Sequence, residues 1–258
     1  MHFITLTSDY GFSSTYASAL KGAIYQSISQ VQVIDINNNI QPFNIIQAAF
    51  VLKNNWFYFP EKTIHFICVD TNIGSNNNVL IAKKNNHYFI GVDNGIFSLM
   101  FDEYDEIYKI NTNNETRNLF VELELFIPAA GNIFNNVALD KMYEKSTIAN
   151  KKQNQMPIIN NNVLSGSVMF IDGYGNALTN INKDLFYNFV NNSEFKIFYR
   201  PRYTINEIRN GYFFKENGEE IALFNSNNLL QFSVNQGSAS QLLGLKFGSP
   251  ILIEKYDK

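Results

Sequence analysis

The stretch from Ile64 to Asn78 constrains the fold most, because an apolar run ends abruptly at an acidic residue. Residues 64–69 read IHFICV, Asp70 follows, and the chain continues as TNIGSNNN. This pattern predicts a buried strand that leads into a polar loop. Ligands of open α/β sheets bind outside the carboxyl ends of the strands, so Asp70 would be well placed for chemistry. The alternative is an Asp that only hydrogen-bonds its own turn.

Strands and helices alternate through the first 150 residues. The opening run HFITLTS ends at Asp9, and residues 31–36 (VQVIDI) form a second predicted strand. Helical spacing of apolar residues predicts helices over Thr15–Ser29 and Ile45–Trp56. This alternation indicates a mainly parallel sheet with helices on both faces. Further along, we predict strands in NVLIAKK and HYFIGVDNG, joined by a turn at Asn85-Asn86, and a strand at residues 106–110. We also predict a short helix near Phe97–Phe101 and a helix over Ile127–Met142, in whose first turn Pro128 lies.

A polar segment separates this region from the remainder of the chain. Residues 151–162 are rich in Asn and contain a Pro, so we predict a linker there, between an α/β domain at residues 1–150 and a second domain at 163–258. Beyond the linker, short β-type runs alternate with Gly, Asn and Pro. They predict a smaller all-β sandwich or barrel, with one helical turn in GSASQLLGL.

Composition disfavours several functional classes. The chain has 258 residues, and its net charge of -3 offers no basic stripe for nucleic acid, so a small-molecule partner is expected. There is no long apolar span and no leader-like N-terminus, so we expect no membrane contact and a cytoplasmic location. The single cysteine, Cys68, cannot form an intramolecular disulfide and is interpreted as a buried thiol. Paired His or Cys spacing is absent from the sequence, so no metal is expected.

Six sequence blocks point to a known family. They are TLTSDYGF with YASALKGAI, NIQPFNIIQAAF, FPEKTIHFICVDTNIGS, GVDNGIFS, SGSVMFIDGYGNALTNI and FNSNNLLQFSVNQGSA. In this order they resemble the signature blocks of the S-adenosylmethionine (SAM) hydroxide adenosyltransferases, relatives of the fluorinase and chlorinase enzymes. The resemblance implies an N-terminal Rossmann-like α/β domain, a C-terminal β-barrel domain, and a homotrimer with sites between one subunit's N-domain and its neighbour's C-domain. It also implies hydrolysis of SAM at ribose C5′ to adenosine and methionine, without a cofactor.

The resemblance assigns ligand-binding roles to residues of these blocks. Asp9 matches the acid that accepts hydrogen bonds from the ribose hydroxyls, and Phe43 matches an aromatic on the ribose face. Asp172 matches the acid that binds the methionine ammonium, and Ser226 the serine that binds its carboxylate. The residues matched to adenine contacts are the side chains of Tyr174, Asn176 and Tyr212 and the backbone near Val234 and Gln236.

Structural alternatives stay open for several of these residues. Asp9 could cap a turn, Phe43 could pack in the core, and the Gly-Tyr-Gly sequence around Tyr174 could form only a tight hairpin. Asp93 and Asn94 match the Asp-Asn-Gly turn of the family, and we interpret them as structural.

The catalytic blocks depart from the family pattern. The hydrolases combine the central acid, here Asp70, with an arginine seven residues later and with a histidine in a Phe-His-Gly-Arg-Asp block. This chain has Asn77 at the arginine position and Val121 at the histidine position. The predicted catalytic set is therefore Asp70 as general base with Asn77, which could hold a water molecule. Both His65 and His87 lie outside matching blocks and are interpreted as structural.

Two functions from different classes remain open. The first is a slow hydrolase that converts SAM to adenosine and methionine. The second is a binding or sensor protein that keeps the adenosyl pocket without the machinery that activates water. Halogenation is disfavoured, because halide-using relatives have an aromatic residue at the position of Asp70 and a hydroxyl residue at Ile73. A carboxylate at that position would repel the halide.

Overall fold

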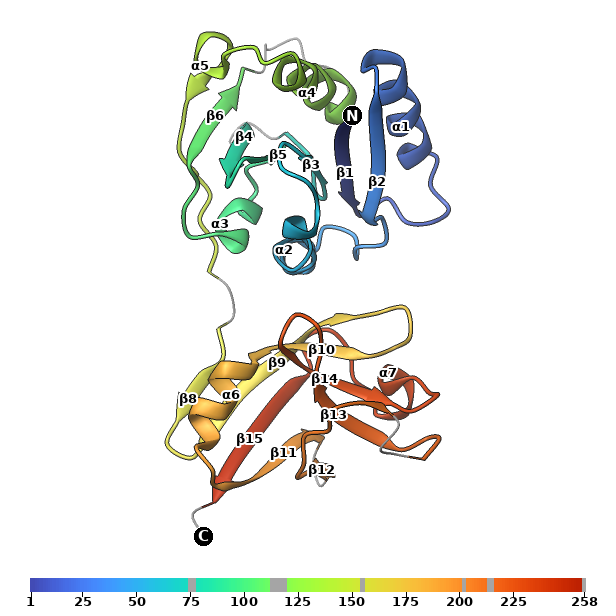
Figure 1. The fold of residues 1–258 in the computed structure, drawn as a ribbon, viewed down its shortest axis with the longest axis vertical. Helices are drawn as coiled ribbons and strands as arrows, with labels where there is room; N and C mark the ends of the chain where they lie inside the picture. Colours follow the sequence, from blue (N-terminus) through green and yellow to red (C-terminus); the bar gives the residue numbers. More distant parts are fainter. Residues whose placement is uncertain (74–77, 112–119, 154–155, 201–202, 213–215, 257–258) are drawn as a thin grey trace. The chain divides into compact units, whose positions relative to one another are not determined.

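A computed structural model describes residues 1–73, 78–111, 120–153, 156–200, 203–212 and 216–256. The chain divides into two compact units, Met1–Asn154 and Gln155–Lys258 (Figure 1). Each unit contains its own sheet and its own buried core, so the protein is a mixed α/β structure with two sheets.

The first unit is a seven-stranded mixed sheet in the order β2-β1-β3-β5-β4-β6-β7. Strands β2, β1, β3 and β5 are parallel, and β4, β6 and β7 are antiparallel to their neighbours. The prediction of a mainly parallel sheet therefore holds for only part of it. Asn85 and Asn86, both with positive φ, form a two-residue turn, and such a turn can join only antiparallel strands. The strands are β1 His2–Ser8, β2 Val31–Asn37, β3 Ile64–Cys68, β4 Val79–Lys84, β5 His87–Val92, β6 Glu106–Ile110 and β7 Glu144–Lys145.

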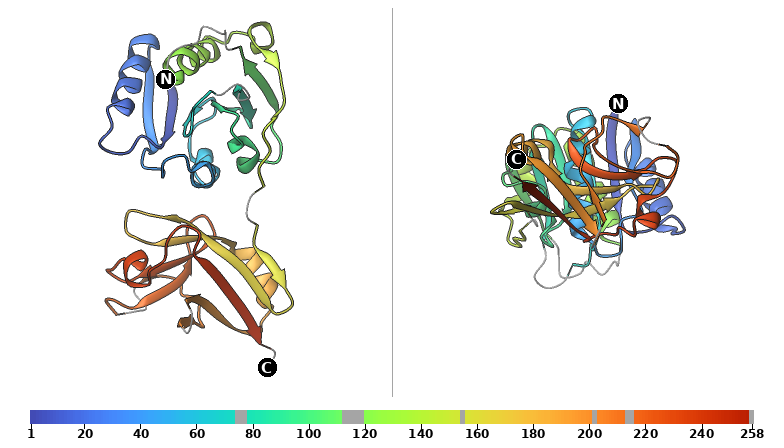
Figure 2. Two further views of the ribbon diagram at one scale, coloured as in Figure 1. Left: turned by 180° about the vertical axis from the view of Figure 1, so that it is seen from behind. Right: turned by 90° about the horizontal axis from the view of Figure 1, so that it is seen from below.

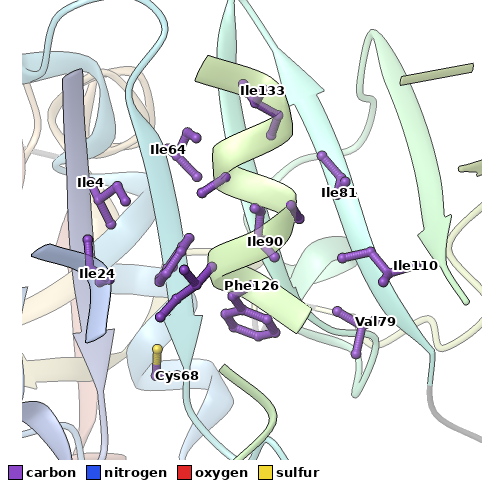
Figure 3. Packing of buried hydrophobic residues seen from close by; sticks show 14 of the residues in the cluster. Ile4, Ile24, Ile64, Cys68, Val79, Ile81, Ile90, Ile110, Phe126 and Ile133 are labelled. Atoms are coloured by element: carbon purple, nitrogen blue, oxygen red, sulfur yellow. The ribbon is translucent and has the colours of Figure 1, made fainter. Parts of the chain in front are cut away.

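Helices cover both faces of this sheet. Successive strand residues point to opposite faces, so Ile90 lies in the core under α1 and α4, and Phe89 points the other way. On that second face the Phe89 ring contacts the rings of Trp56 and Phe101 at centroid distances of 5.9 and 5.4 Å. Figure 3 shows Phe126 and Ile133 over the strands of the first face. The helices are α1 Tyr16–Ser27, α2 Ile45–Lys53, α3 Ile96–Met100, α4 Ile127–Phe134, α5 Leu139–Met142, the 3₁₀ turn η1 Trp56–Tyr58 and the π-helical turn η2 Glu122–Phe126.

The prediction of one helix over Ile127–Met142 is wrong. The helix α4 ends at Phe134, and α5 begins only at Leu139. Asn136, between them, has φ +52°, a left-handed conformation that ends a helix and that Asn adopts more readily than most residues. Upstream, the helical path begins earlier than predicted, with the π-helical turn η2 at Glu122.

The second unit is an eight-stranded, nearly barrel-shaped sheet, in which β8 pairs with β9 beside the main order β12-β11-β15-β9-β10-β14-β13. Figure 2 shows this unit from behind, where β15 crosses between β9 and β11. Strand β8 lies within the segment 151–162 that the sequence predicts to be a linker. The strands are β8 Ile158–Asn160, β9 Val163–Ile171, β10 Ala177–Asn182, β11 Glu194–Arg200, β12 Tyr203–Ile205, β13 Glu220–Phe224, β14 Leu229–Val234 and β15 Pro250–Tyr256.

This unit also contains helices, so the all-β prediction is wrong for part of it. Helix α6 spans Lys183–Val190, and the short α7 spans Ala239–Leu242, where one helical turn was expected. The side chain of Asn182 caps α6 by accepting a hydrogen bond from the Leu185 amide at 2.7 Å. The helix buries an apolar face that includes Phe186 and Phe189. This short amphipathic segment directly follows β10 and was not predicted as a helix from the sequence.

Neither a membrane span nor a metal cluster is found in the part of the chain that the structure describes. The longest helix there, α1, has 12 residues, which is about 18 Å. None of the helices is long and apolar enough to cross a bilayer. Groups of three or more His, Cys, Asp or Glu side chains placed to hold a metal ion are likewise absent from these residues.

Two histidines form a buried pair between β3 and β5. The His65 Nδ1 atom lies 2.7 Å from the Thr5 hydroxyl, and its Nε2 lies 3.1 Å from His87 Nδ1. This pairing agrees with the structural interpretation of both residues. Burial lowers the pKa of His65 to about 3 and also lowers the pKa of His87. The folded protein therefore favours neutral imidazoles at both positions.

We expect this pair to make the first unit sensitive to acid. The pKa of His65 is 6.5 when unperturbed and about 3 in the folded protein, so below pH 6.5 the unfolded chain binds the proton more tightly. The stability that depends on neutral His65 is therefore fully present above pH 6.5 and decreases as the pH falls toward 3. Between pH 7 and pH 5 this residue should cost about 2 kcal/mol of unfolding free energy.

Urea unfolding at both pH values would measure this loss. The variant His65→Gln should lose less stability on acidification than the wild type, and His2→Gln serves as the control because His2 lies outside the pair. An unchanged pH dependence in His65→Gln would contradict the interpretation.

Candidate functional site

The carboxyl ends of β1 and β3 form a topological switch point. The chain runs from β1 through α1 to β2 on one side, and from β2 through α2 to β3 on the other side of β1. Crevices that bind ligands lie outside the strand ends at such a point. Asp9 follows β1 directly, and Asp70 follows the end of β3, so the fold brings both predicted acids to one edge of the sheet.

The Asp9 carboxylate joins three segments that are distant in sequence. Its Oδ2 accepts hydrogen bonds from the amide of Phe43 at 2.9 Å and from the amide of Asp70 at 3.3 Å. The Asp9 amide in turn donates to the carbonyl of Cys68 at 3.3 Å. Asp9 is therefore more than a cap of its own turn. The core-packing alternative for Phe43 is wrong, because the residue is 73% exposed.

Two residues of this edge have strained backbones. Phe43 and Asp70 have φ values of +63° and +50°, although neither is glycine. Such conformations cost about 1–3 kcal/mol and cluster at functional sites. Asp70 is held on both sides, because its amide donates to Asp9 and its carbonyl accepts from Asn94 Nδ2 at 3.0 Å. The fold thus fixes the direction in which the Asp70 side chain leaves the backbone.

The Asp93-Asn94 turn connects the loop after β3 with residues 149–150. Asp93 is fully buried, and its Oδ2 accepts hydrogen bonds from the amides of Ala149 at 2.8 Å and Asn150 at 3.2 Å. Burial raises the pKa of this carboxyl group. These contacts agree with the structural interpretation of the turn.

A buried polar cluster beneath the edge was missed by the sequence analysis. Glu122, the first residue of η2, is 1% exposed and accepts a hydrogen bond from the Tyr10 hydroxyl at 2.8 Å. Burial raises the pKa of Glu122 and, above all other causes, that of Tyr10. The available signal was an acid inside the apolar run FVELELFIPAAG. Val121, where relatives have histidine, is buried in the core, and Asn77 lies outside the described residues.

The second unit contains an open pocket of about 620 Å³. Tyr174 and Tyr212 line it and are 83% and 41% exposed, so both rings can reach a ligand. The Tyr212 hydroxyl accepts a hydrogen bond from Gln231 Nε2 on β14 at 2.9 Å, a positioning contact that the sequence did not reveal. The pocket brings together all five residues predicted to meet adenine, namely Tyr174, Asn176, Tyr212, Val234 and Gln236, with Asn235, Gly237 and Ser238.

Asp172 shapes the turn that presents two of these residues. Its Oδ1 accepts hydrogen bonds from the amides of Tyr174 and Asn176, both at 2.9 Å, and its Oδ2 accepts from Asn176 Nδ2 at 2.8 Å. Gly175 has φ +83°, and a Cβ there would lie 2.0 Å from the Ser238 hydroxyl, so the turn requires glycine. The tight turn that the sequence offered as the structural alternative around Tyr174 is therefore present in the structure.

Ser226 lies apart from this pocket. It is exposed in the turn between β13 and β14, whereas Val234 lies at the opposite end of β14. Ser226 is not among the residues that line the pocket. The structure therefore does not bring Ser226 together with the predicted adenine residues.

Comparison with known proteins places these sites in a family context. Residues 4–143 match the SAM hydroxide adenosyltransferase N-terminal domain, and residues 166–252 match the corresponding C-terminal domain. An (R)-S-adenosyl-L-methionine hydrolase of Methanocaldococcus jannaschii is 30% identical over 96% of this chain and 94% of its own. A protein of the same name from Thermus thermophilus is 23% identical over 97% of this chain and 99% of its own.

Solved structures share the fold of the whole chain. A crystal structure of an uncharacterized conserved protein from Thermotoga maritima has a TM-score of 0.87 at 25% identity and covers 99% of this chain and 100% of its own. A conserved hypothetical protein from Thermus thermophilus has a TM-score of 0.75 at 21% identity over 98% of this chain and 100% of its own. The second similarity concerns the fold alone.

The Asp9 contacts predict a measurable loss of stability in Asp9→Ala. The amides of Phe43 and Asp70 would lose their acceptor, and we expect about 1–2 kcal/mol less unfolding free energy. Asp9→Asn keeps one acceptor oxygen and should lose less. Urea unfolding at pH 7 measures both, and wild-type stability in Asp9→Ala would show that the carboxylate does not hold these segments.

Proposed function

The chain belongs to the SAM hydroxide adenosyltransferase family, and from this premise we propose that it hydrolyses S-adenosyl-L-methionine to adenosine and L-methionine. The names of the relatives from M. jannaschii and T. thermophilus support this activity. The observation that carries the proposal is Asp70, which extends from a backbone fixed by Asp9 and Asn94 at the switch point.

In the proposed reaction, water attacks ribose C5′ opposite the sulfonium. The C5′–O bond forms while the C5′–S bond breaks, and the electron pair of that bond goes to sulfur, so methionine leaves as a neutral thioether. Asp70 takes the proton of the attacking water. A positioned general base contributes about 10²–10⁴ to the rate, and a fixed geometry opposite the leaving group contributes further. Asn77 is proposed to hold the water.

The substrate would be held by groups from the first unit of one subunit and from the second unit of its neighbour. We assign the ribose hydroxyls to Asp9 and the ribose face to the exposed ring of Phe43. The methionine ammonium is assigned to Asp172, whose two oxygens can accept more bonds than the three that the turn uses, and the methionine carboxylate to Ser226. Adenine is assigned to the pocket of the second unit, in which stacking on an aromatic ring is worth about 1–3 kcal/mol. A Rossmann-like description of the first unit and a β-barrel description of the second belong to the same proposal.

One observation favours the second candidate, a binding or sensor protein. Val121 is buried and apolar at the position where the hydrolases have a histidine. A valine side chain has no group that could bind or polarise water. A protein with this replacement could bind the adenosyl ligand without turnover.

SAM turnover by wild type, compared with that of Asp70→Ala, distinguishes the hydrolase from the binding or sensor protein. The protein is incubated with SAM, and adenosine and methionine are followed by liquid chromatography and mass spectrometry. We expect wild type to release both products and Asp70→Ala to be slower by about a hundredfold or more. The exposed Asp102 provides the matched control, and Asp102→Asn should keep wild-type turnover.

Calorimetric titration with adenosine completes the test. Asp70→Ala should bind adenosine within about threefold of wild type, because Asp70 is assigned to the water and not to the nucleoside. Wild type that binds adenosine but forms no product would favour the sensor. Unchanged turnover in Asp70→Ala would refute the proposed base, and a protein that neither binds nor reacts would refute both candidates.

We also propose a homotrimer whose sites combine the first unit of one subunit with the second unit of its neighbour, as the family resemblance implies. Subunits of Asp70→Ala and Tyr212→Ala variants, each weak alone, should then complement one another after mixing and subunit exchange. Half of the first units carry Asp70 and half of the second units carry Tyr212, so an equal mixture should recover about a quarter of wild-type activity. Light scattering gives the mass, and exchange without recovery would contradict shared sites.

A further inference from the structure

Glu122 is one of two almost fully buried carboxylates among the described residues. The other, Asp93, accepts hydrogen bonds from the backbone amides of residues 149 and 150. Glu122 begins the π-helical turn η2, a rare geometry that often occurs near functional sites. Burial of a carboxylate is costly unless hydrogen-bond donors reach it, so the identity of its partners indicates what Glu122 does.

The partners of Glu122 come from both loops of the switch point. The Tyr10 hydroxyl donates to Glu122 Oε1 at 2.8 Å, and the Thr71 side chain also hydrogen-bonds to this carboxylate. Tyr10 directly follows Asp9, and Thr71 directly follows Asp70. One buried side chain therefore links the residues next to both predicted acids.

The cluster extends to the strand beneath. The Tyr10 hydroxyl also forms a hydrogen bond with the thiol of Cys68, the last residue of β3. Cys68 is fully buried. The Tyr10 ring packs edge-on against Phe120 at 6.2 Å, which joins the approach to η2 to the same loop. The Tyr10 side chain in the loop after β1 therefore contacts both the end of β3, through Cys68, and the turn η2, through Glu122.

We propose that Glu122 is a positioning residue, which fixes the loops after β1 and β3 and thereby places Asp70 for attack on the substrate. Two carboxylates then hold the same loops by hydrogen bonds. Asp9 holds the backbone of Asp70, and Glu122 holds the side chains of Tyr10 and Thr71. A small displacement of a reacting group is expensive in catalysis, because the attacking atom must lie in line with the scissile bond. The catalytic consequence of this inference rests on the proposed hydrolysis.

The test compares Glu122→Gln with Tyr10→Phe, the double variant and the matched control Glu124→Gln. Glutamine keeps the shape of Glu122 but presents an amide group to one of the two donors. Tyr10→Phe removes a single hydroxyl and keeps the ring, so it tests the same link if Glu122→Gln folds poorly. Glu124 lies in the same turn η2 and is only partly buried.

Two measurements are made on each variant. Hydrogen exchange, followed by mass spectrometry, should become faster in residues 9–12 and 69–73 of Glu122→Gln and Tyr10→Phe, and should stay unchanged in Glu124→Gln. With SAM, kcat per adenosine-binding site should fall about tenfold to a hundredfold while KM stays within about threefold. The double variant should be no slower than the slower single variant, because both changes break one link.

The outcomes separate this inference from the proposed function. Wild type that forms no adenosine would refute hydrolysis, and exchange alone would then decide whether Glu122 holds the loops. Unchanged exchange in Glu122→Gln would overturn the inference. An active wild type with an unchanged kcat in Glu122→Gln would overturn it as well. A kcat loss that merely follows a loss of folded protein would disappear after normalisation to binding sites, and would also count against positioning.

Discussion

The Asp9 carboxylate is the interaction on which the edge of the first sheet depends. A single oxygen accepts the amides of Phe43 and Asp70, which belong to segments 34 and 61 residues away. Both of these residues adopt left-handed backbone conformations that a side chain normally disfavours. Hydrogen bonds to an ionised acceptor are stronger than neutral ones, so one acid can stabilise both strained residues. The direction of the Asp70 side chain follows from this contact.

Acidic residues have different uses in this protein, and their burial and hydrogen-bond partners distinguish them. Asp9 ties distant backbone segments, Asp93 anchors residues 149–150, and Asp172 shapes a local turn. Glu122 instead meets hydroxyl groups of two loops while it is almost excluded from water. Asp70 differs from these four: among the described residues, the contacts that hold it are those of its backbone, through its amide with Asp9 and its carbonyl with Asn94. Its carboxylate is therefore the group that we assign to chemistry.

Much of the strand pattern and part of the site could be predicted from the sequence. Alternation and apolar runs are local signals, and they located strands such as β3 and β14 within a residue or two. The Asn85-Asn86 turn was also predicted, but the helix break at Asn136 and the short helix α6 were missed. In the site, the sequence predicted the acids at the strand ends and five residues that line the pocket of the second unit, whereas Ser226 lies at the other end of β14.

The sequence by itself determined which residue types stand at the ends of the strands and which family blocks the chain carries. Only the tertiary structure decided how those residues are used, because hydrogen bonds between distant segments leave no periodic signal in the sequence. Glu122 illustrates the difference: in the sequence it is one acid in an apolar run, and in the fold it meets Tyr10 and Thr71. Burial gives that contact its importance, since a carboxylate removed from water must be satisfied by the protein itself.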